Sequence, residues 1–262
     1  MADVTKLLRH PVRYIPRIGK VVLQQFCWLF QNSSFFLQGQ MDIHPQARWR
    51  TPLVAQTGGF YPKGDGVNRE IKNLDPHDNT RRDMLVLLLR AVTEQQIPGA
   101  FAELGVYKGA TARLIHYYAP ERQLHLFDTF EGFTERSSGA ELRGAGATAS
   151  MFSDTSLERV RDFVRPANDN VFFHKGFFPE SIPAALHSDT FAFVHLDADL
   201  YDPIIAGLGF FYPRLQRRGV LVVHDYNSWA GARKAVEEFF RDKPEFPIPM
   251  PDKSGSAVIV KI

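Results

Sequence analysis

Acidic side chains follow several apolar runs of this sequence, at the points where buried strands are expected to end. In FAFVHLDADLYDP (191–203), an apolar run leads directly into two aspartates two residues apart. The acids at such strand ends are Glu103, Asp128, Asp197, Asp199 and Asp225. A buried carboxylate without a partner is costly, so these acids need a compensating group. Ligands of open α/β sheets bind beyond the carboxyl ends of the strands, and the acids therefore predict one polar site at that edge.

A tight turn between a strand and a helix is expected in AELGVYKGATA (102–112), where Gly105 and Gly109 flank the bend. Glycine at these positions lets a ligand approach the backbone, and the amides at the helix start can bind a carboxylate or a phosphate. A turn that serves packing alone is the competing interpretation. Asp128, at the end of the next strand, is placed to accept hydrogen bonds from two ribose hydroxyls, although an acid there could also cap a turn. Together the turn and the acid predict a ligand that contains adenosine.

The charge of Glu103 limits which adenosine-containing ligands suit this site. Dinucleotide sites carry the pattern GxGxxG, whereas the middle position here is Tyr107 rather than a glycine. Glu103 would also repel a pyrophosphate, but it suits a ligand with an ammonium or sulfonium cation. The pattern therefore favours S-adenosylmethionine as the cofactor.

Strands and helices are expected to alternate after residue 80. Helices are predicted at 81–96, 110–119, 156–164, 201–217 and 230–242, with a short one near 180–187. Strands are predicted at 100–104, 123–128, 170–175, 191–197 and 219–225. Continuous apolar strands separated by amphipathic helices indicate a parallel sheet that is covered on both faces. The prolines of EFPIPMP (245–251) confine that segment to an edge strand, and SAVIVKI (256–262) follows as an antiparallel last strand.

This order of elements predicts a class I methyltransferase fold, which is α/β, Rossmann-like and doubly wound, with a mostly parallel seven-stranded sheet and an antiparallel last strand. Residues 81–262 are expected to form this catalytic domain. Residues 1–80 are expected to be a helical or irregular extension that acts as a lid or an oligomerisation segment. The long connections 51–79 and 129–155 could fold over the cofactor. Candidates for contact with the acceptor are Phe60, Tyr61 and Trp229.

Six segments of the sequence occur in an order that a known family shares. They are AELGVYKGATA (102–112), LFDTFEGF (126–133), KGFFPESIP (175–183), HLDADLYDP (195–203), YPRLQRRGVLVVHDY (212–226) and GARKAVEEF (231–239). The chain thereby resembles the macrocin O-methyltransferase family, enzymes of antibiotic tailoring and related sugar methylation. The resemblance covers about residues 80–262, and residues 1–60 carry no comparable signature. It implies S-adenosylmethionine as cofactor, usually together with a magnesium ion.

The resemblance also implies roles for individual residues at the cofactor. Glu103, Gly105 and Tyr107 would line its methionine end, Thr111 would hold its carboxylate, Asp128 would bind the ribose, and Gly176 and Phe177 would border the adenine. Gly109, in the same turn as Gly105, is included among the cofactor-binding residues.

A second set of implied roles concerns the metal. Asp197 would bind the metal and could also take the proton of the acceptor hydroxyl. The second metal motif of the family commonly reads Asp-Asp-Tyr, but this sequence has His224, Asp225 and Tyr226 there. Asp225 therefore keeps its role and the first acid is lost, which leaves the metal shell and the need for metal open.

Methyl transfer to a hydroxyl requires an acceptor oxygen that is aligned and deprotonated. A hard divalent cation bound to that oxygen lowers its pKa and fixes its direction. Magnesium suits carboxylate ligands, and Asp197 and Asp225, at the ends of neighbouring strands, can converge on one ion. His224 could be a third ligand, a general base or a strand-end histidine with structural contacts. The predicted reaction is a magnesium-assisted O-methylation of a hydroxyl on a sugar-containing small molecule or a glycan.

Several residues near these strand ends have a structural interpretation beside the functional one. Asp199 is expected to cap the helix that begins near Tyr201, with a role at the metal as the alternative. Asp202 is expected in the first turn of that helix, where the helix dipole favours an acid. His195 is expected to be a core residue or to support a ligand. Lys175 is either a contact for an anion or a solvated lysine.

Composition limits the classes of protein to which the chain can belong. A net charge of +2 over 262 residues gives no case for nucleic-acid binding. Cys27 is the one cysteine of the sequence, so no internal disulfide can form and the cytoplasm is the expected compartment. Residues 1–20 are basic and residues 21–30 mainly apolar, but this apolar run is too short to span a bilayer.

This N-terminal segment has two interpretations. It could be a helix packed on the domain or on a second subunit of a homodimer. It could instead make a peripheral contact with an anionic membrane or cover the substrate.

Two other functions compete with methyl transfer. A nicotinamide-dependent oxidoreductase could use a similar sheet, but the missing GxGxxG and the charge of Glu103 argue against it. A membrane-associated or scaffold protein with a vestigial site would carry its function in residues 1–45. The complete set of strand-end acids argues against a decayed site.

Overall fold

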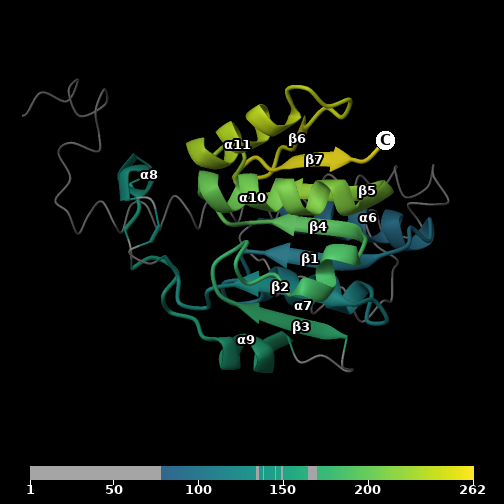
Figure 1. The fold of residues 1–262 in the computed structure, drawn as a ribbon, viewed down its shortest axis with the longest axis horizontal. Coiled ribbons are helices and arrows are strands. Elements are labelled where there is room, and N and C mark those ends of the chain that lie inside the picture. The colour runs from purple at the N-terminus through teal and green to yellow at the C-terminus, as the bar shows by residue number, and fades with distance from the viewer. Residues whose placement is uncertain (1–77, 134–135, 138, 145, 149, 165–169) are drawn as a thin grey trace, which may run out of the picture. The chain divides into compact units, whose positions relative to one another are not determined.

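The structure is a computed structural model that describes residues 78–133, 136–137, 139–144, 146–148, 150–164 and 170–262 (Figure 1). The predictions for the extension 1–80 and the connection 51–79 fall almost entirely outside these residues, and those for Phe60 and Tyr61 do so completely. None of the described helices combines the length and the apolar character that crossing a bilayer requires.

One seven-stranded sheet forms the centre of the described part of the chain, in the order β3-β2-β1-β4-β5-β7-β6. Its strands are β1 (Ala100–Leu104), β2 (Leu124–Asp128), β3 (Val171–Lys175), β4 (Phe191–Leu196), β5 (Leu215–Val223), β6 (Ile248–Pro249) and β7 (Ala257–Val260). Strands β1 to β5 are parallel, and β7 is antiparallel to both of its neighbours. The arrows of β1 to β4 accordingly point one way in Figure 1 and the arrow of β7 the other way. The predicted fold class is confirmed, including the proline-containing strand at the edge.

Apart from the short α8, the helices of the described residues pack beside this sheet in two groups. The helices are α6 (Asn79–Glu94), α7 (Ala110–Tyr118), α8 (Gly139–Gly144), α9 (Leu157–Val164), α10 (Tyr201–Phe211) and α11 (Ala230–Phe240), with short 3-10 helices η2 (Ala184–Ser188) and η3 (Tyr212–Arg214). Helix α7 packs against both α6 and α9, and α10 packs against α11. Strands β1 and β4 are buried along their whole length. Such burial requires the continuous apolar runs from which these strands were predicted.

The parallel register brings the ends of the strands together. Glu103 of β1 pairs with His195 of β4, and Leu196 at the end of β4 pairs with Val223 at the end of β5. The chain continues this pairing by one residue beyond each strand, because the amide of His224 donates to the carbonyl of Leu196 over 2.8 Å. Asp197 and His224 therefore begin the loops at the same edge of the sheet.

The structure corrects two boundaries. The helix predicted at 201–217 ends at Phe211 in α10, and Leu215 already belongs to β5 because it pairs with Phe191 of β4. A short helix, α8, also forms within the connection 129–155, where the sequence predicts none. Its six residues include two glycines and show too little apolar periodicity to predict a helix.

Candidate active site

A cavity of about 810 Å³ lies at the carboxyl ends of the parallel strands. Its volume falls within the range of about 300–1,000 Å³ that is typical of small-molecule sites. The predicted site residues that line it are Glu103, Gly105, Tyr107, Thr111, Asp128, Gly176, Phe177, Asp197, His224 and Asp225. Gly109 does not line this cavity, and neither does Trp229, a predicted contact of the acceptor. The strand-end residues singled out in the sequence thus share one hollow in the described part of the chain.

The turn between β1 and α7 has left-handed backbone at Gly105, with a φ of 86°, and at Gly109, with a φ of 82°. A Cβ atom at Gly105 would lie 2.0 Å from the carbonyl oxygen of Asp197, so no larger residue fits beside the end of β4. A Cβ atom at Gly109 would lie 3.0 Å from the side chain of Val160 in α9. Packing alone therefore explains both glycines, and their contact with a cofactor stays a prediction.

Asp128, the last residue of β2, holds this turn in place. One carboxylate oxygen accepts from the amides of Val106 (2.6 Å) and Tyr107 (2.9 Å), and the other accepts from the amide of Phe130 (2.6 Å). A carboxylate offers about four lone-pair directions, and the hydroxyl of Thr129, 3.5 Å from the second oxygen, faces the one that the three amides leave. The role of Asp128 at a ribose stays a prediction, and its role in fixing the turn is a finding.

Glu103 is completely buried beside His195. The Oε1 atom of Glu103 lies 3.0 Å from Nδ1 of His195, and among the described residues neither Oε2 of Glu103 nor Nε2 of His195 has a hydrogen-bond partner. Burial raises the pKa of Glu103 well above its ordinary value, and the nearby charge of Asp197 adds to this. Burial also lowers the pKa of His195 to about 3. Burial thus favours the uncharged form of both residues, and one carboxyl oxygen has no partner among the described residues.

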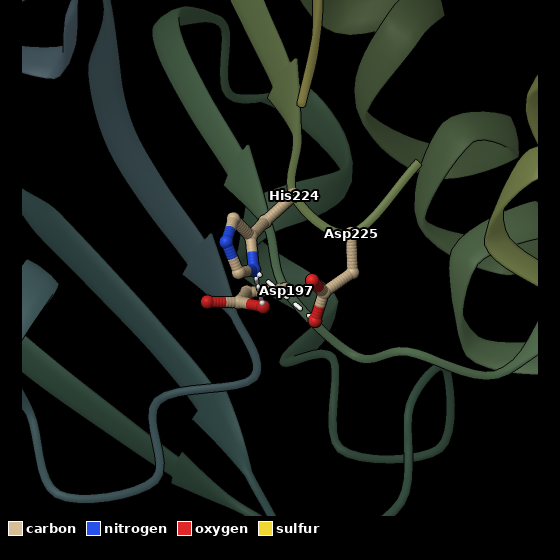
Figure 2. A group of neighbouring side chains, drawn as sticks. All are labelled: Asp197, His224 and Asp225. Carbon is tan, nitrogen blue, oxygen red and sulfur yellow. Dashed lines mark hydrogen bonds and ion pairs between the residues drawn. The ribbon is translucent and has the colours of Figure 1, made fainter. Parts of the chain in front are cut away.

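Asp197, His224 and Asp225 form a compact cluster just beyond β4 and β5 (Figure 2). Nδ1 of His224 lies 2.7 Å from an oxygen of Asp197 and 3.3 Å from an oxygen of Asp225. The three donor atoms lie within 4.8 Å of one another. Two carboxylates and one imidazole at this spacing fit a single divalent cation, although a nitrogen ligand is less suited to Mg²⁺ than a third carboxylate would be.

Charges within this cluster act on one another. Burial favours the neutral forms, but the carboxylates of Asp197 and Asp225 outweigh it and raise the pKa of His224 to about 10. Despite burial, the charge and the hydrogen bond of His224 hold the pKa of Asp197 below its usual range. Both acids, which are partly buried, are therefore held ionised by a neighbouring cation or hydrogen-bond donor.

Asp199 does not cap the following helix, which corrects the leading interpretation of this residue. The N-cap of α10 is Leu200 and makes no side-chain hydrogen bond. Instead, Glu141 of α8 accepts from the amide of Tyr201 over 2.9 Å. Asp199 is buried beside the cluster, and burial together with the charge of Asp197 raises its pKa well above the usual range. Asp202 lies in the first turn of α10, as predicted.

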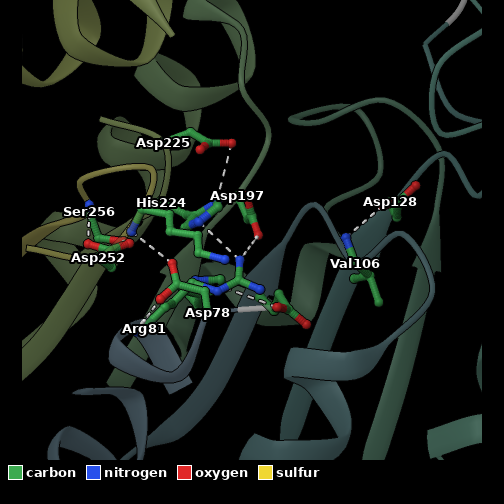
Figure 3. A network of polar contacts seen from close by, with 12 residues as sticks. Asp78, Arg81, Val106, Asp128, Asp197, His224, Asp225, Asp252 and Ser256 are labelled. Atoms are coloured by element: carbon green, nitrogen blue, oxygen red, sulfur yellow. Dashed lines mark hydrogen bonds and ion pairs between the residues drawn. The ribbon is translucent and has the colours of Figure 1, made fainter. Parts of the chain in front are cut away.

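Arg81 in the first turn of α6 reaches the same cluster (Figure 3). Its Nη1 atom lies 3.0 Å from Nε2 of His224 and 3.6 Å from Oδ2 of Asp197. The sequence analysis does not identify Arg81, because an arginine next to Arg82 at the start of a helix gives no signal that one of the two points into a site. This guanidinium opposes a second proton on His224, because it can only donate and so needs Nε2 as an acceptor.

Segment 129–155 contributes one wall of the cavity through Thr129, Gly132, Phe133, Arg136, Ser137 and Phe152. The ring of Phe152 meets that of Tyr107 at 5.0 Å, and the ring of Phe133 meets that of Trp229 at 6.0 Å. Arg136 lies over the face of Phe177 at 4.1 Å. The described part of this segment therefore borders the cavity as expected, and its movement as a lid stays a prediction.

Lys175, at the end of β3, pairs with Glu131 over 2.8 Å. Its exposed side chain agrees with the reading of a solvated lysine at a strand end.

The sheet order and the cavity at its carboxyl edge define a class I methyltransferase fold. The structure of the O-methyltransferase NovP superimposes with a TM-score of 0.58 at 22% identity, covering 87% of this chain and 99% of that chain. The crystal structure of CalS11, a calicheamicin methyltransferase, gives 0.56 at 20% identity, covering 75% and 86%. At these identities the likeness shows the fold. Residues 78–260 match the family model described as Macrocin-O-methyltransferase (TylF). The chain belongs to this family, as its six segments predict.

Curated relatives of the chain are named as O-methyltransferases. The 8-demethyl-8-(2,3-dimethoxy-alpha-L-rhamnosyl)-tetracenomycin-C 4'-O-methyltransferase of Streptomyces olivaceus is 29% identical over 172 residues, which cover 61% of this chain and 64% of the relative. The mycinamicin III 3''-O-methyltransferase of Micromonospora griseorubida is 30% identical over 160 residues, which cover 56% and 62%. The alignments thus span somewhat less than two thirds of each relative's length.

Proposed function

We propose that the protein is an S-adenosylmethionine-dependent O-methyltransferase that acts on a hydroxyl of a sugar-containing small molecule or glycan, with assistance from Mg²⁺. The observation that carries this proposal is the pairing of two features in one cavity. Glu103 has a buried carboxyl oxygen without a partner among the described residues, and Asp197, His224 and Asp225 form a cluster of possible metal ligands at the neighbouring strand ends. Membership of the macrocin O-methyltransferase family supports it.

In this proposal the β1–α7 turn and the ends of β2 and β3 bind the cofactor. The ammonium group of the cofactor satisfies the free Oε2 of Glu103, and this requires Glu103 to ionise. The residues assigned to the rest of the cofactor are Gly105, Tyr107, Gly109 and Thr111 at the turn, Asp128 at the ribose, and Gly176 and Phe177 at the adenine. Arg136 over the ring of Phe177 would close the adenine end against water.

Asp197, Asp225 and His224 would hold the divalent cation. When bound, such an ion lowers the pKa of the acceptor hydroxyl and fixes its orientation. Asp197 takes the hydroxyl proton in this proposal, and His224 stabilises the carboxylate through the 2.7 Å contact between Nδ1 and Oδ1. The walls from segment 129–155 exclude water and hold the acceptor oxygen in line with the sulfonium methyl group.

Sugar hydroxyls are the proposed acceptors because of the names of the relatives. The relatives from S. olivaceus and M. griseorubida are named for methylation at the 4' and 3'' positions of glycosylated natural products. No comparable support exists for a nicotinamide cofactor, since the family that the chain matches is one of methyltransferases.

The proposal extends to the rest of the chain. Residues 81–262 would form the catalytic domain, and residues 1–80 would contribute to acceptor recognition, to a homodimer or to a peripheral membrane contact. The cytoplasm is the proposed compartment. Sedimentation of the full chain, with and without anionic vesicles, separates these roles of the extension.

A screen for methyl transfer tests the proposed function. Labelled S-adenosylmethionine would be offered with nucleotide sugars, glycosides and phenols, in the presence and absence of Mg²⁺. Transfer to a glycoside or nucleotide sugar is the expected result. Absence of cofactor binding at millimolar concentration in isothermal titration would reject the methyltransferase. Full activity in excess chelator would reject the metal and leave the methyltransferase standing.

A further inference from the structure

Arg81 brings a permanent positive charge into the acid cluster. Its side chain is 18% exposed, and its Nη1 atom lies within ion-pair distance of Oδ2 of Asp197 at 3.6 Å and within hydrogen-bond distance of Nε2 of His224 at 3.0 Å. Both partners are among the three residues that fit a divalent cation. The cluster thus contains a cation supplied by helix α6 (Figure 3).

Hydrogen bonds of Asp78 fix the start of α6 and thereby position Arg81 beside the acid cluster. Asp78 is the N-cap, and one of its oxygens accepts from the amide of Arg81 over 3.0 Å. The other oxygen accepts from the amide of Lys253 in the turn between β6 and β7 over 2.9 Å. Asp252 fixes that turn by accepting from the amide of Ser256 over 2.7 Å. Two separate elements therefore hold the backbone from which Arg81 extends.

The contact from Arg81 determines which nitrogen of His224 can act. A guanidinium has only donors, so this contact needs Nε2 as an acceptor and opposes the second proton that the neighbouring carboxylates favour on His224. Nδ1 then donates to Asp197 over 2.7 Å. A histidine binds metal through an unprotonated nitrogen. As long as Arg81 keeps this contact, neither nitrogen of His224 has a lone pair to offer a metal.

We propose that Arg81 is an internal cation that competes with the divalent metal for the cluster of Asp197, His224 and Asp225, and thereby sets the affinity for metal. Two effects act in the same direction. The guanidinium repels a second cation at short range, where water screens the charges poorly. It also contacts Nε2 of His224 and partly neutralises the carboxylate of Asp197. This inference rests on the metal part of the proposed function.

The competition predicts that neutralising Arg81 strengthens metal binding. Mn²⁺ is a suitable probe, because it accepts oxygen ligands in octahedral geometry and the free ion is counted by electron paramagnetic resonance. Arg81→Gln should bind Mn²⁺ at least about tenfold more tightly than the unchanged protein. Arg81→Lys keeps the positive charge and should stay within about threefold of the unchanged protein.

Controls separate this charge effect from a change in folding. Arg90→Gln removes a charge from the same helix, where Arg90 pairs with Glu94 outside the cavity, and should leave the affinity unchanged. Thermal melting of each variant reports whether it is folded.

Three results would overturn the proposal: equal or weaker Mn²⁺ binding by Arg81→Gln, equal tightening by Arg81→Lys, or no Mn²⁺ binding by any variant at millimolar concentration. The last result also removes the metal from the proposed function. Methyl transfer, measured separately with labelled donor, would still decide whether the protein is a methyltransferase.

Discussion

Glu103 and His195 form a polar pair that is closed to solvent, with Nδ1 of His195 3.0 Å from Oε1 of Glu103. The two residues occupy paired positions on the adjacent strands β1 and β4. His195 thereby fixes one carboxyl oxygen and leaves the other, Oε2, without a partner at the cavity. A buried polar atom without a partner destabilises the folded protein, and a ligand donor that satisfies it removes this cost. In the proposed function, a cationic group of the cofactor satisfies this oxygen.

Replacing the acid of this pair tests its role. Glu103→Gln keeps the shape of the side chain but cannot become negative, so S-adenosylmethionine should bind about ten- to a hundredfold more weakly. Isothermal titration measures the affinity directly. Glu131→Gln is a matched control, because Glu131 is exposed and pairs with Lys175. An unchanged affinity in Glu103→Gln would remove Glu103 from the cofactor site.

The raised pKa of Glu103 makes cofactor binding depend on pH. Because burial raises this pKa, the free protein keeps Glu103 protonated at pH values where an ordinary glutamate is ionised. A cationic ligand needs the carboxylate, so binding releases a proton and becomes tighter as the pH rises toward the raised pKa. Titrations in two buffers with different ionisation enthalpies count the released proton. The same proton release in Glu103→Gln would contradict this assignment.

Many of the strands around this site can be predicted from the sequence, because a strand in a sheet that is buried on both faces is a continuous apolar run. The run at 100–104 coincides with strand β1, and the strand ends at Asp128 and Lys175 lie where the sequence places them. The glycine turn and the acid cluster follow from these ends.

Contacts between distant segments could not be predicted in this way. The partnership of Glu103 and His195 depends on the register of β1 and β4, and Arg81 differs from Arg82 only in the direction of its side chain. The residue that caps α10 could not be predicted from the sequence either. Asp199 has the sequence position of a cap, but Glu141, sixty residues before Tyr201, accepts the hydrogen bond from the amide of Tyr201.

The hydrogen bond from the amide of Tyr201 in α10 to Glu141 in α8 requires a glycine at position 231. A Cβ atom at Gly231 would lie 1.4 Å from Oε1 of Glu141 and 2.7 Å from the amide nitrogen of Tyr201. Gly231→Ala should therefore displace Glu141 and destabilise the protein by about 1 kcal/mol, which is the usual value of a helix cap. Hydrogen exchange at Tyr201 should become faster. Gly209→Ala is the control, because a Cβ atom at Gly209 in α10 meets nothing within 4 Å. Equal effects of the two variants would show that the cap contributes nothing.

The stability of the protein should fall on acidification because of a buried histidine, His125 of strand β2. Burial and the neighbouring His174 lower the pKa of His125 to about 4, and His125 stacks on Phe172 at 5.0 Å. Between about pH 6.5 and 4 the unfolded chain binds a proton that the folded protein excludes, so stability decreases as the pH falls. His125→Phe should remove about 1–3 kcal/mol of this loss between pH 7 and pH 4 in denaturant titrations.

An exposed histidine provides the control for that measurement. His187→Gln should keep the acid sensitivity of the unchanged protein. If His125→Phe loses as much stability between pH 7 and pH 4 as His187→Gln does, His125 is not the origin of the acid sensitivity.

Substitution by asparagine should change turnover differently at Asp197 and at Asp199, the two acids that follow strand β4. Asp197 is held ionised by His224, whereas burial and the charge of Asp197 raise the pKa of Asp199 and so favour its protonated form. Asparagine resembles a protonated aspartic acid, so Asp199→Asn should lower turnover by less than about fivefold. Asp197→Asn removes the charge that receives the hydroxyl proton in the proposed function, and should lower turnover by about 10²–10⁴ while cofactor binding persists. Steady-state rates with labelled donor, together with titration of the cofactor, measure both. Equal losses in the two variants would place the reacting proton elsewhere in the cluster, with Asp225 as the next residue to replace.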